Sequence, residues 1–209
     1  ELVICAMLLA SRNVVGGAAW VKEQAAAGED VEKVVEKGKS QFVGPEIQGK
    51  TLGVVGLGAI GVQVANIATK LGMTVWGYDP FLSVDAALSL SRMVQRANDL
   101  ETIYKNCDYI TLHLPLNGDT KGMIDASALQ MMKGGVRLIN LARGGLVTDD
   151  DLLQALESGK VACYVTDFPN NKIIQGRNVV AIPHLGASTP ESEENCAVMA
   201  AQQLRDYLE

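Results

Sequence analysis

The sequence predicts an α/β protein in which a parallel β-sheet is covered by helices on both faces. Three observations support this fold class. From Lys50 onward, short apolar runs alternate with longer segments of helical periodicity. The runs are apolar at nearly every position, as expected for strands that are buried on both faces. A glycine-rich segment, Gly56–Gly61, directly follows the first run and opens a helical pattern.

The first fifty residues are expected to be mainly helical. The segment Leu2–Asn13 is apolar almost all round, which predicts a helix covered on both sides. The pair Gly16 and Gly17 is expected to end this helix, because glycine weakens a helix interior. A charged, more exposed segment follows over Glu29–Lys37, and Gly38–Gly49 is expected to be an irregular connector.

Strands and helices then alternate along the rest of the chain. Strands are predicted over Leu52–Val55, Thr74–Gly77, Tyr109–His113, Val136–Asn140, Ala162–Thr166 and Val179–Ile182. Helices are predicted to start near Ala59, Ser83, Ser127 and Asp149, with another short helix over Leu100–Asn106. Three aspartates after Thr148 favour a helix start, because carboxylates are stabilised in a first helical turn. In the last helix, Ser188 or Thr189 is the expected N-cap and Pro190 the first residue.

The segment Gly56-Leu57-Gly58-Ala59-Ile60-Gly61 is the most informative motif of the chain. The first glycine permits a tight turn, the second lets the backbone approach a pyrophosphate, and the third lets the helix pack close to the strand. Asp79 lies 23 residues beyond Gly56, where it can bind an adenosine ribose. The alternative is a glycine-rich turn without a ligand, but strand, helix and distal acid together favour a Rossmann-type, doubly wound dinucleotide fold.

The same region indicates which dinucleotide is bound. The carboxylate of Asp79 repels a ribose 2′-phosphate, and no Arg or Lys occurs in Pro80–Asp85 to bind one. NAD is therefore expected rather than NADP.

Composition narrows the function classes further. The chain has 209 residues, of which 48% are hydrophobic and 20% charged, as in a soluble globular protein with a substantial core. Its net charge is −6 and it has no block of Lys and Arg, so neither nucleic acid nor membrane is an expected partner. The four cysteines are far apart and read as buried free thiols, which predicts no metal, no disulfide and a cytoplasmic protein.

Two polar residues that follow predicted strands are candidates for chemistry. Arg143 precedes Gly144 and Gly145, so its guanidinium is uncrowded and can grip a carboxylate; the alternative is an arginine in a surface turn. His184 follows the last strand and can exchange a proton near neutral pH, although a lone histidine is more often structural. His113 is expected to line a pocket wall rather than to act in catalysis.

Taken together, these motifs closely resemble the D-isomer-specific 2-hydroxyacid dehydrogenases. The resemblance covers nearly the whole chain and rests on Thr51–Gly61, Asn140–Gly145 and Pro183–Thr189, which stand in the family's order. Two further stretches, Tyr164–Pro169 and Glu193–Ala200, are similar to the members of the family that oxidise 3-phosphoglycerate.

The resemblance implies a role for each site residue. Arg143 would bind the substrate carboxylate and 2-oxygen, and His184 would be the acid and base. Asp79 would hold the adenosine ribose, and Asp167 the nicotinamide carboxamide. The complete cofactor site would comprise Gly56, Gly58, Ala59, Ile60, Gly61, Asp79, Leu114, Leu141, Ala142, Arg143, Asp167, His184 and Gly186, with Ala59 and Ile60 over the pyrophosphate and Leu114 and Leu141–Arg143 beside the nicotinamide.

The sequence departs from the family at one catalytic position. The family usually has a Glu shortly after the Asp-Phe-Pro stretch, paired with the catalytic histidine, whereas this chain has Asn171 at the expected equivalent. An amide orients an imidazole but stabilises its charge less than a carboxylate does. Activity is then shifted to lower pH, another carboxylate substitutes, or the protein is weakly active.

The resemblance also implies the domain organisation and the reaction. Residues 1–209 would form an NAD-binding domain, with a helical dimerisation and connector segment over 1–49, a Rossmann core over 50–187 and a C-terminal helix over 188–209. A split substrate domain would lie outside this segment. The expected reaction is oxidation of 3-phosphoglycerate with NAD by a homodimer. The alternatives are a related dehydrogenase acting on glycerate, glyoxylate or lactate, or a non-catalytic NAD-sensing scaffold of the corepressor type.

Overall fold

The computed structural model describes residues 1–208 and contains one seven-stranded, fully parallel sheet. In spatial order the strands are β3 (Val94–Arg96), β2 (Thr74–Tyr78), β1 (Thr51–Val55), β4 (Tyr109–Leu112), β5 (Val136–Asn140), β6 (Val161–Thr166) and β7 (Val179–Ala181). The order reverses between β1 and β4, which opens a crevice beyond the carboxyl ends of these strands. The predicted fold class is confirmed.

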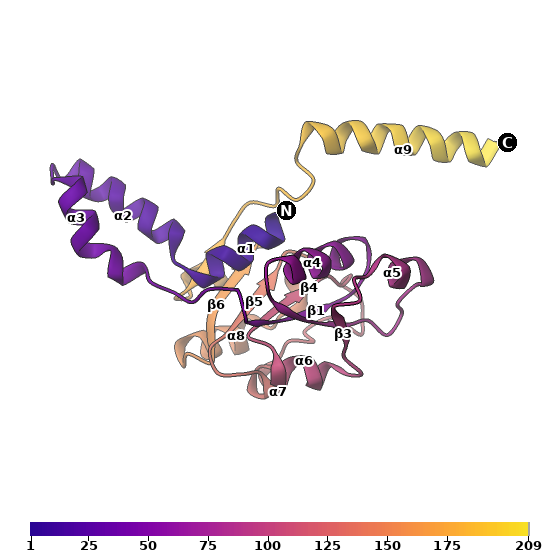
Figure 1. Cartoon of the computed structure of the whole chain (residues 1–209), viewed down its shortest axis with the longest axis horizontal. Coiled ribbons are helices and arrows are strands. Elements are labelled where there is room, and N and C mark those ends of the chain that lie inside the picture. The colour runs from indigo at the N-terminus through magenta and orange to yellow at the C-terminus, as the bar shows by residue number, and fades with distance from the viewer. Residues whose placement is uncertain (209) are drawn as a thin grey trace.

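Helices cover both faces of this sheet (Figure 1). In chain order they are α1 (Leu2–Ser11), α2 (Val14–Ala26), α3 (Val31–Gly38), α4 (Ala59–Lys70), α5 (Val84–Ser89), α6 (Leu100–Asn106), α7 (Ala126–Met131), α8 (Asp149–Glu157) and α9 (Pro190–Leu208). Helices α1 and α4 pack on one face, and α6, α7 and α8 on the other. Three short 3₁₀ helices, η1 (Lys39–Phe42), η2 (Gly144–Leu146) and η3 (Ile173–Gln175), lie in connecting segments.

The predicted elements agree with the structure to within about one residue at most boundaries. The N-cap of the last helix is Thr189, whose hydroxyl accepts a hydrogen bond from the Ser192 backbone at 3.1 Å. Glu209, at the end of the predicted segment 188–209, lies outside the described residues. Strand β3 was not predicted, because its three residues, Val94-Gln95-Arg96, carry too little apolar pattern.

The prediction for the N-terminal segment is wrong in two respects. Helix α1 buries one face against β5, β6 and α4, but Leu8 on its other side is 39% exposed. The glycine pair lies inside α2 rather than at a break, because the Asn13 side chain accepts a hydrogen bond from the Gly16 backbone at 3.0 Å and caps α2. The chain turns at Arg12, which is extended.

A buried polar contact fixes α1 to the sheet. The Ser11 hydroxyl donates to the Met7 carbonyl and lies 2.8 Å from the Tyr109 hydroxyl, which therefore acts as its donor. Arg137 of β5 donates from Nε to the Ala10 carbonyl at 2.8 Å and lies over the Tyr109 ring. The end of α1 is thus attached to β4 and β5 through side chains that are otherwise surrounded by apolar residues.

Two parts of the chain extend away from the sheet (Figure 1). Helices α2 and α3 form a hairpin that is closed by Trp20 and Phe42, whose ring centroids are 5.3 Å apart. Helix α9 runs in the opposite direction. Neither α2, α3 nor α9 has a buried residue in the described chain.

Two of the four cysteines are buried and two are exposed. Burial raises the pKa values of Cys107 and Cys163 to about 12 and about 11, whereas Cys5 and Cys196 are exposed, contrary to expectation.

Within residues 1–208 no single helix has the length and apolar character needed to cross a membrane. By length and composition alone, α1 and α2 pass that test as a pair, although they meet at a 68° bend.

His113, directly after β4, is a partly buried titratable group beneath the glycine turn. Its Nε2 lies 3.0 Å from the Thr111 hydroxyl, and burial lowers the pKa of the ring to about 4. Its carbonyl oxygen lies against Gly56. His113 is therefore neutral at pH 7, in keeping with a structural role in the wall of the site.

The lowered pKa of His113 makes folding stability depend on pH. In the unfolded chain His113 takes up a proton as the pH falls below about 6.5. In the folded chain it does so only near pH 4, because its pKa is lowered. Stability should therefore fall by up to about 3 kcal/mol as the pH drops through this window. Urea unfolding at pH 7 and pH 4.5 should show a smaller loss for His113→Gln than for the unsubstituted chain, and equal losses would contradict the assignment.

Candidate functional site

The candidate site lies where the carboxyl ends of the central strands meet the glycine turn between β1 and α4. Of the residues predicted from sequence, Gly56–Gly61 follow β1, Asp79 follows β2 and Leu114 follows β4. Arg143, Asp167 and His184 lie after β5, β6 and β7 respectively. The parallel sheet therefore brings residues far apart in sequence to one edge.

The three glycines of the motif are required for different reasons. Gly56 has φ of +94°, and a Cβ there would lie 2.5 Å from the His113 carbonyl oxygen. A Cβ on Gly61 would lie 2.0 Å from the Gly56 carbonyl oxygen, so this glycine allows α4 to pack against the turn. A Cβ on Gly58 would have no atom within 4 Å. The space above Gly58 is open, as the approach of a pyrophosphate requires.

The N-terminus of α4 suits an anion. No side chain caps the helix at Gly58, and its first turn has no acidic residue. Ala59 and Ile60 are exposed at this end, Ile60 by 63%. Because the first N–H groups of a helix lack intrahelical acceptors and carry the positive end of its dipole, they can receive phosphate oxygens.

Asp79 holds the glycine turn in addition to facing the adjacent pocket. Its Oδ2 accepts a hydrogen bond from the Leu57 backbone, and its Oδ1 accepts one from the Phe81 backbone, both at 2.8 Å. A carboxylate has further lone pairs, so these bonds leave capacity for ribose hydroxyls. The sequence predicted the ligand role of Asp79 but not its structural one.

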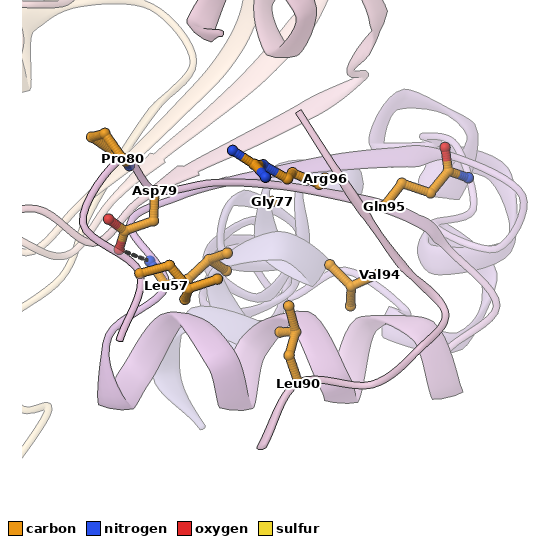
Figure 2. Close-up of a pocket in the computed structure, with 9 residues that line it drawn as sticks. Leu57, Gly77, Asp79, Pro80, Leu90, Val94, Gln95 and Arg96 are labelled. Atoms are coloured by element: carbon orange, nitrogen blue, oxygen red, sulfur yellow. Dashed lines mark hydrogen bonds between the residues drawn. The ribbon is translucent and has the colours of Figure 1, made fainter. Parts of the chain in front are cut away.

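A pocket of about 290 Å³ lies beside Asp79 (Figure 2). Leu57, Leu90 and Val94 form its apolar side, and Asp79, Pro80 and Arg96 lie around its other side. Arg96 comes from β3, the strand that was not predicted. A cation therefore lines this pocket together with Asp79, although no Arg or Lys occurs over Pro80–Asp85.

Arg143 lies in a turn that is held by the buried side-chain amide of Asn140. Asn140, fully buried at the end of β5, donates from Nδ2 to the Arg143 carbonyl at 2.8 Å and to the Tyr164 hydroxyl at 3.3 Å. Its Oδ1 accepts from the Ala142 backbone at 3.2 Å. Sequence reasoning assigned no role to Asn140, although an asparagine that ends an apolar strand was the available signal.

Phe168 is close to both candidate catalytic side chains, and sequence reasoning also missed it. The centroid of its ring lies 4.7 Å from the centroid of the His184 ring and 6.0 Å from the guanidinium carbon of Arg143. A Cβ on Gly144 would lie 3.3 Å from the Phe168 Cβ. A side chain at position 144 would therefore press on Phe168.

The hydrogen-bond partner of His184 is Asp167. His184 Nδ1 lies 2.7 Å from Asp167 Oδ2, and the Asp167 side chain is 3% exposed whereas the His184 side chain is 56% exposed. Asn171, predicted to stand beside His184, lies in an exposed turn, where its backbone carbonyl accepts a hydrogen bond from the Gln175 side chain. The residue after β6 that contacts His184 is Asp167, four positions before Asn171, which the motif spacing indicated.

The remaining predicted cofactor residues occupy distinct surroundings. The Leu114 side chain approaches to 3.0 Å from a Cβ built on Gly56, so it lies over the turn. Leu141 and Ala142 are partly buried and pack against the cores on opposite faces of the sheet. Gly186 lies in the loop before α9, and a Cβ there would have no atom within 4 Å. The other oxygen of Asp167, Oδ1, is buried and has no hydrogen-bond partner within residues 1–208.

These features fit a nicotinamide dinucleotide. The open space at Gly58 and the uncapped α4 suit the pyrophosphate, Asp79 suits a ribose diol, and Asp167 Oδ1 lacks a donor such as a carboxamide would supply. No group of three or more metal-ligating side chains is assembled in the described part of the chain.

Comparison with curated proteins places these residues in a family. Residues 4–186 match the family described as D-isomer specific 2-hydroxyacid dehydrogenase, NAD binding domain. The D-3-phosphoglycerate dehydrogenase of a Synechocystis species is 39% identical over 188 residues, which cover 86% of this chain and 33% of the relative. The Rattus norvegicus protein of the same name is 41% identical over 176 residues, covering 81% of this chain and 32% of the relative. The chain thus spans about a third of the length of these relatives.

Solved structures give the same result for the fold. A glyoxylate reductase from Paecilomyes thermophila has a TM-score of 0.79 at 29% identity, covering 99% of this chain and 60% of that one. An Aquifex aeolicus D-lactate dehydrogenase complexed with NAD and lactic acid has a TM-score of 0.69 at 27% identity, covering 85% of this chain and 60% of that one. NAD is the cofactor that both the family description and the geometry of the glycine turn support. The chain therefore belongs to the D-isomer-specific 2-hydroxyacid dehydrogenase family and contains its NAD-binding domain.

Proposed function

We propose that the protein containing this chain oxidises 3-phosphoglycerate to 3-phosphohydroxypyruvate with NAD, a reaction of serine biosynthesis. The single observation that carries the reaction type is that Arg143 and His184 both contact Phe168, at the carboxyl edge of the sheet. The substrate is supported by relatives named D-3-phosphoglycerate dehydrogenase at 35–41% identity.

The chain's own residues provide binding, orientation and proton transfer. NAD, when bound, supplies the acceptor for the hydride that leaves the substrate C2. Arg143 binds the substrate carboxylate, and the turn fixed by Asn140 holds its backbone in place for that contact. His184 takes the hydroxyl proton on Nε2 during oxidation and returns it during reduction. In this proposal Gly58, Ala59 and Ile60 hold the pyrophosphate, and Asp79 holds the ribose.

Two alternatives have different support. A related dehydrogenase acting on another small 2-hydroxy acid is supported by the solved glyoxylate reductase and D-lactate dehydrogenase structures. A non-catalytic NAD-sensing scaffold was favoured by the missing family carboxylate. Because Asp167 supplies a carboxylate in contact with His184, that argument for the scaffold is removed.

We also propose that the protein is a cytoplasmic homodimer without nucleic-acid or membrane partners. The segment 1–45 supports a subunit interface, because apolar side chains at Leu8, Val14, Val15 and Val43 are exposed there. Light scattering at tens of micromolar should give twice the monomer mass. Replacing both Val14 and Val15 with Ser should shift the mass toward the monomer, whereas a monomeric unsubstituted protein would contradict the proposal.

Alanine substitutions at the two glycines at the start of α4 should have different effects: one on cofactor affinity and the other on folding stability. Gly58→Ala meets no protein atom and has an ordinary φ of −73°, so the melting temperature should stay nearly unchanged. Its methyl group would occupy the pyrophosphate approach, so NADH affinity measured by calorimetry should fall by at least about tenfold, or 1.4 kcal/mol. Gly61→Ala, in contrast, should lose about 1–3 kcal/mol of folding stability, because its Cβ would clash with the Gly56 carbonyl.

The same calorimetry should show tighter binding of NADH than of NADPH to the unsubstituted chain, because Asp79 faces the ribose pocket. Unchanged NADH affinity in Gly58→Ala would show that the dinucleotide does not cross this turn.

The substrate is tested by NADH formation with the full protein that contains this chain. Among 3-phosphoglycerate, glycerate, glycolate and D-lactate, 3-phosphoglycerate should give the highest kcat/KM. Arg143→Ala should lower kcat/KM on the order of 100-fold, because the variant loses the charge that orients the substrate. The exposed Arg177→Ala is the matched control and should have no effect.

Two other results of this assay would each support one of the two alternative functions. A higher kcat/KM with another acid would indicate a related dehydrogenase. NADH binding without turnover of any 2-hydroxy acid would indicate the scaffold.

A further inference from the structure

We propose that Asp167 is the positioning residue for His184 and replaces the carboxylate that the family usually carries at the position of Asn171. The inference rests on the proposed function, because it assigns His184 a proton-transfer role. It goes beyond that function by naming the group that fixes which ring nitrogen carries the proton.

The contact geometry selects one tautomer of His184. Asp167 Oδ2 lies 2.7 Å from His184 Nδ1, a distance typical of a charge-assisted hydrogen bond. An ionised carboxylate only accepts hydrogen bonds, so Nδ1 carries a proton and donates it to Asp167. In the neutral ring Nε2 is then unprotonated and can accept the proton of a substrate hydroxyl.

Consecutive residues hold the ring from two sides. Asp167 binds Nδ1, and the ring of Phe168 packs at 4.7 Å between centroids. The end of β6 fixes both, because the Thr166 hydroxyl accepts a hydrogen bond from the Phe168 backbone at 3.1 Å. The segment after Phe168 forms a turn, in which the Asn170 side chain accepts hydrogen bonds from the backbones of Lys172 and Ile173, both at 2.9 Å.

Asp167 is the charged group in hydrogen-bond contact with the His184 ring. On neighbouring elements, the charged groups are Arg143, which lies over the Phe168 ring, and Asp149, at the start of α8. Lys172 is paired with Asp150, and Glu191 and Glu193 lie in the first turn of α9. Within the described chain, the salt bridge of Asp167 is to His184, so its buried charge acts on the imidazolium.

This arrangement determines how charge develops in the reaction. When Nε2 takes the hydroxyl proton, His184 becomes an imidazolium whose Nδ1 proton stays on the ring and points at Asp167. The carboxylate remains ionised, and no second proton moves. Asp167 thereby stabilises the protonated ring and keeps it oriented, which is the task expected of the family's Glu.

The proposal can be tested first without any substitution. The 209-residue chain has only two histidines, so the ¹⁵N signals of their rings are readily separated. Above neutral pH, His184 should be in the Nδ1–H form, which free imidazole does not prefer. His113 provides an internal reference, because burial lowers its pKa to about 4. A neutral His184 in the Nε2–H form would overturn the proposal.

Substitutions then test the carboxylate. In Asp167→Ala, the neutral His184 ring should lose its preference for the Nδ1–H form, because the acceptor of that proton is removed. The exposed Asp150→Ala is the matched control and should leave the tautomer unchanged. The same tautomer in Asp167→Ala and in the unsubstituted chain would refute the role of Asp167. If Asp167→Ala does not fold, the tautomer of the unsubstituted chain decides.

Kinetics of the full protein connect the pair to the reaction. In Asp167→Ala, kcat for 3-phosphoglycerate should fall at least tenfold, because the acceptor that orients the His184 ring is removed. Asp167→Glu keeps a carboxylate and should retain both the Nδ1–H form and part of kcat. Loss of the Nδ1–H form in Asp167→Ala with unchanged kcat would overturn the positioning role. Absence of turnover in the unsubstituted protein would instead refute the proposed function and leave the tautomer result standing.

Discussion

The close approach of α4 to the glycine turn is the constraint on which the rest of the structure depends. The Gly56 backbone donates to the Tyr78 carbonyl at 2.8 Å, and Asp79 binds the Leu57 backbone, so the turn is tied to the end of β2. The missing side chain of Gly61 lets the first turn of the helix sit directly against Gly56. One contact therefore sets the angle of α4, the position of Asp79 and the direction in which the free helix N-terminus points.

The other half of the site is organised by buried polar side chains at the ends of β5 and β6. Asn140 shapes the turn that carries Arg143 and reaches Tyr164, which burial keeps neutral by raising its pKa. Phe168 then packs against both Arg143 and His184. The strands that carry these groups are packed between two hydrophobic clusters, one on each face of the sheet, so strand register sets where each loop begins.

The sequence predicted the parts of this structure that depend on local pattern. The strands of the central sheet, the glycine turn and the cap at Thr189 are encoded in adjacent residues, and they were found. Strand β3 was missed because it is formed by pairing with β2 and not by its own apolar residues. Asp167 was assigned to the cofactor and Asn171 to His184, because motif spacing cannot show where a turn places each side chain. The glycines of α2 were misjudged because the Asn13 cap outweighs their low helix propensity.

The double use of Asp79 constrains how this protein could be redesigned to accept NADP. Arg96 already borders the ribose pocket, so a cation for an added phosphate is present. Removing the carboxylate alone would leave the backbone N–H groups of Leu57 and Phe81 without their acceptors. A change of cofactor therefore requires a short neutral side chain that still accepts a hydrogen bond, such as Asn or Ser, so that specificity is altered while the glycine turn keeps its support.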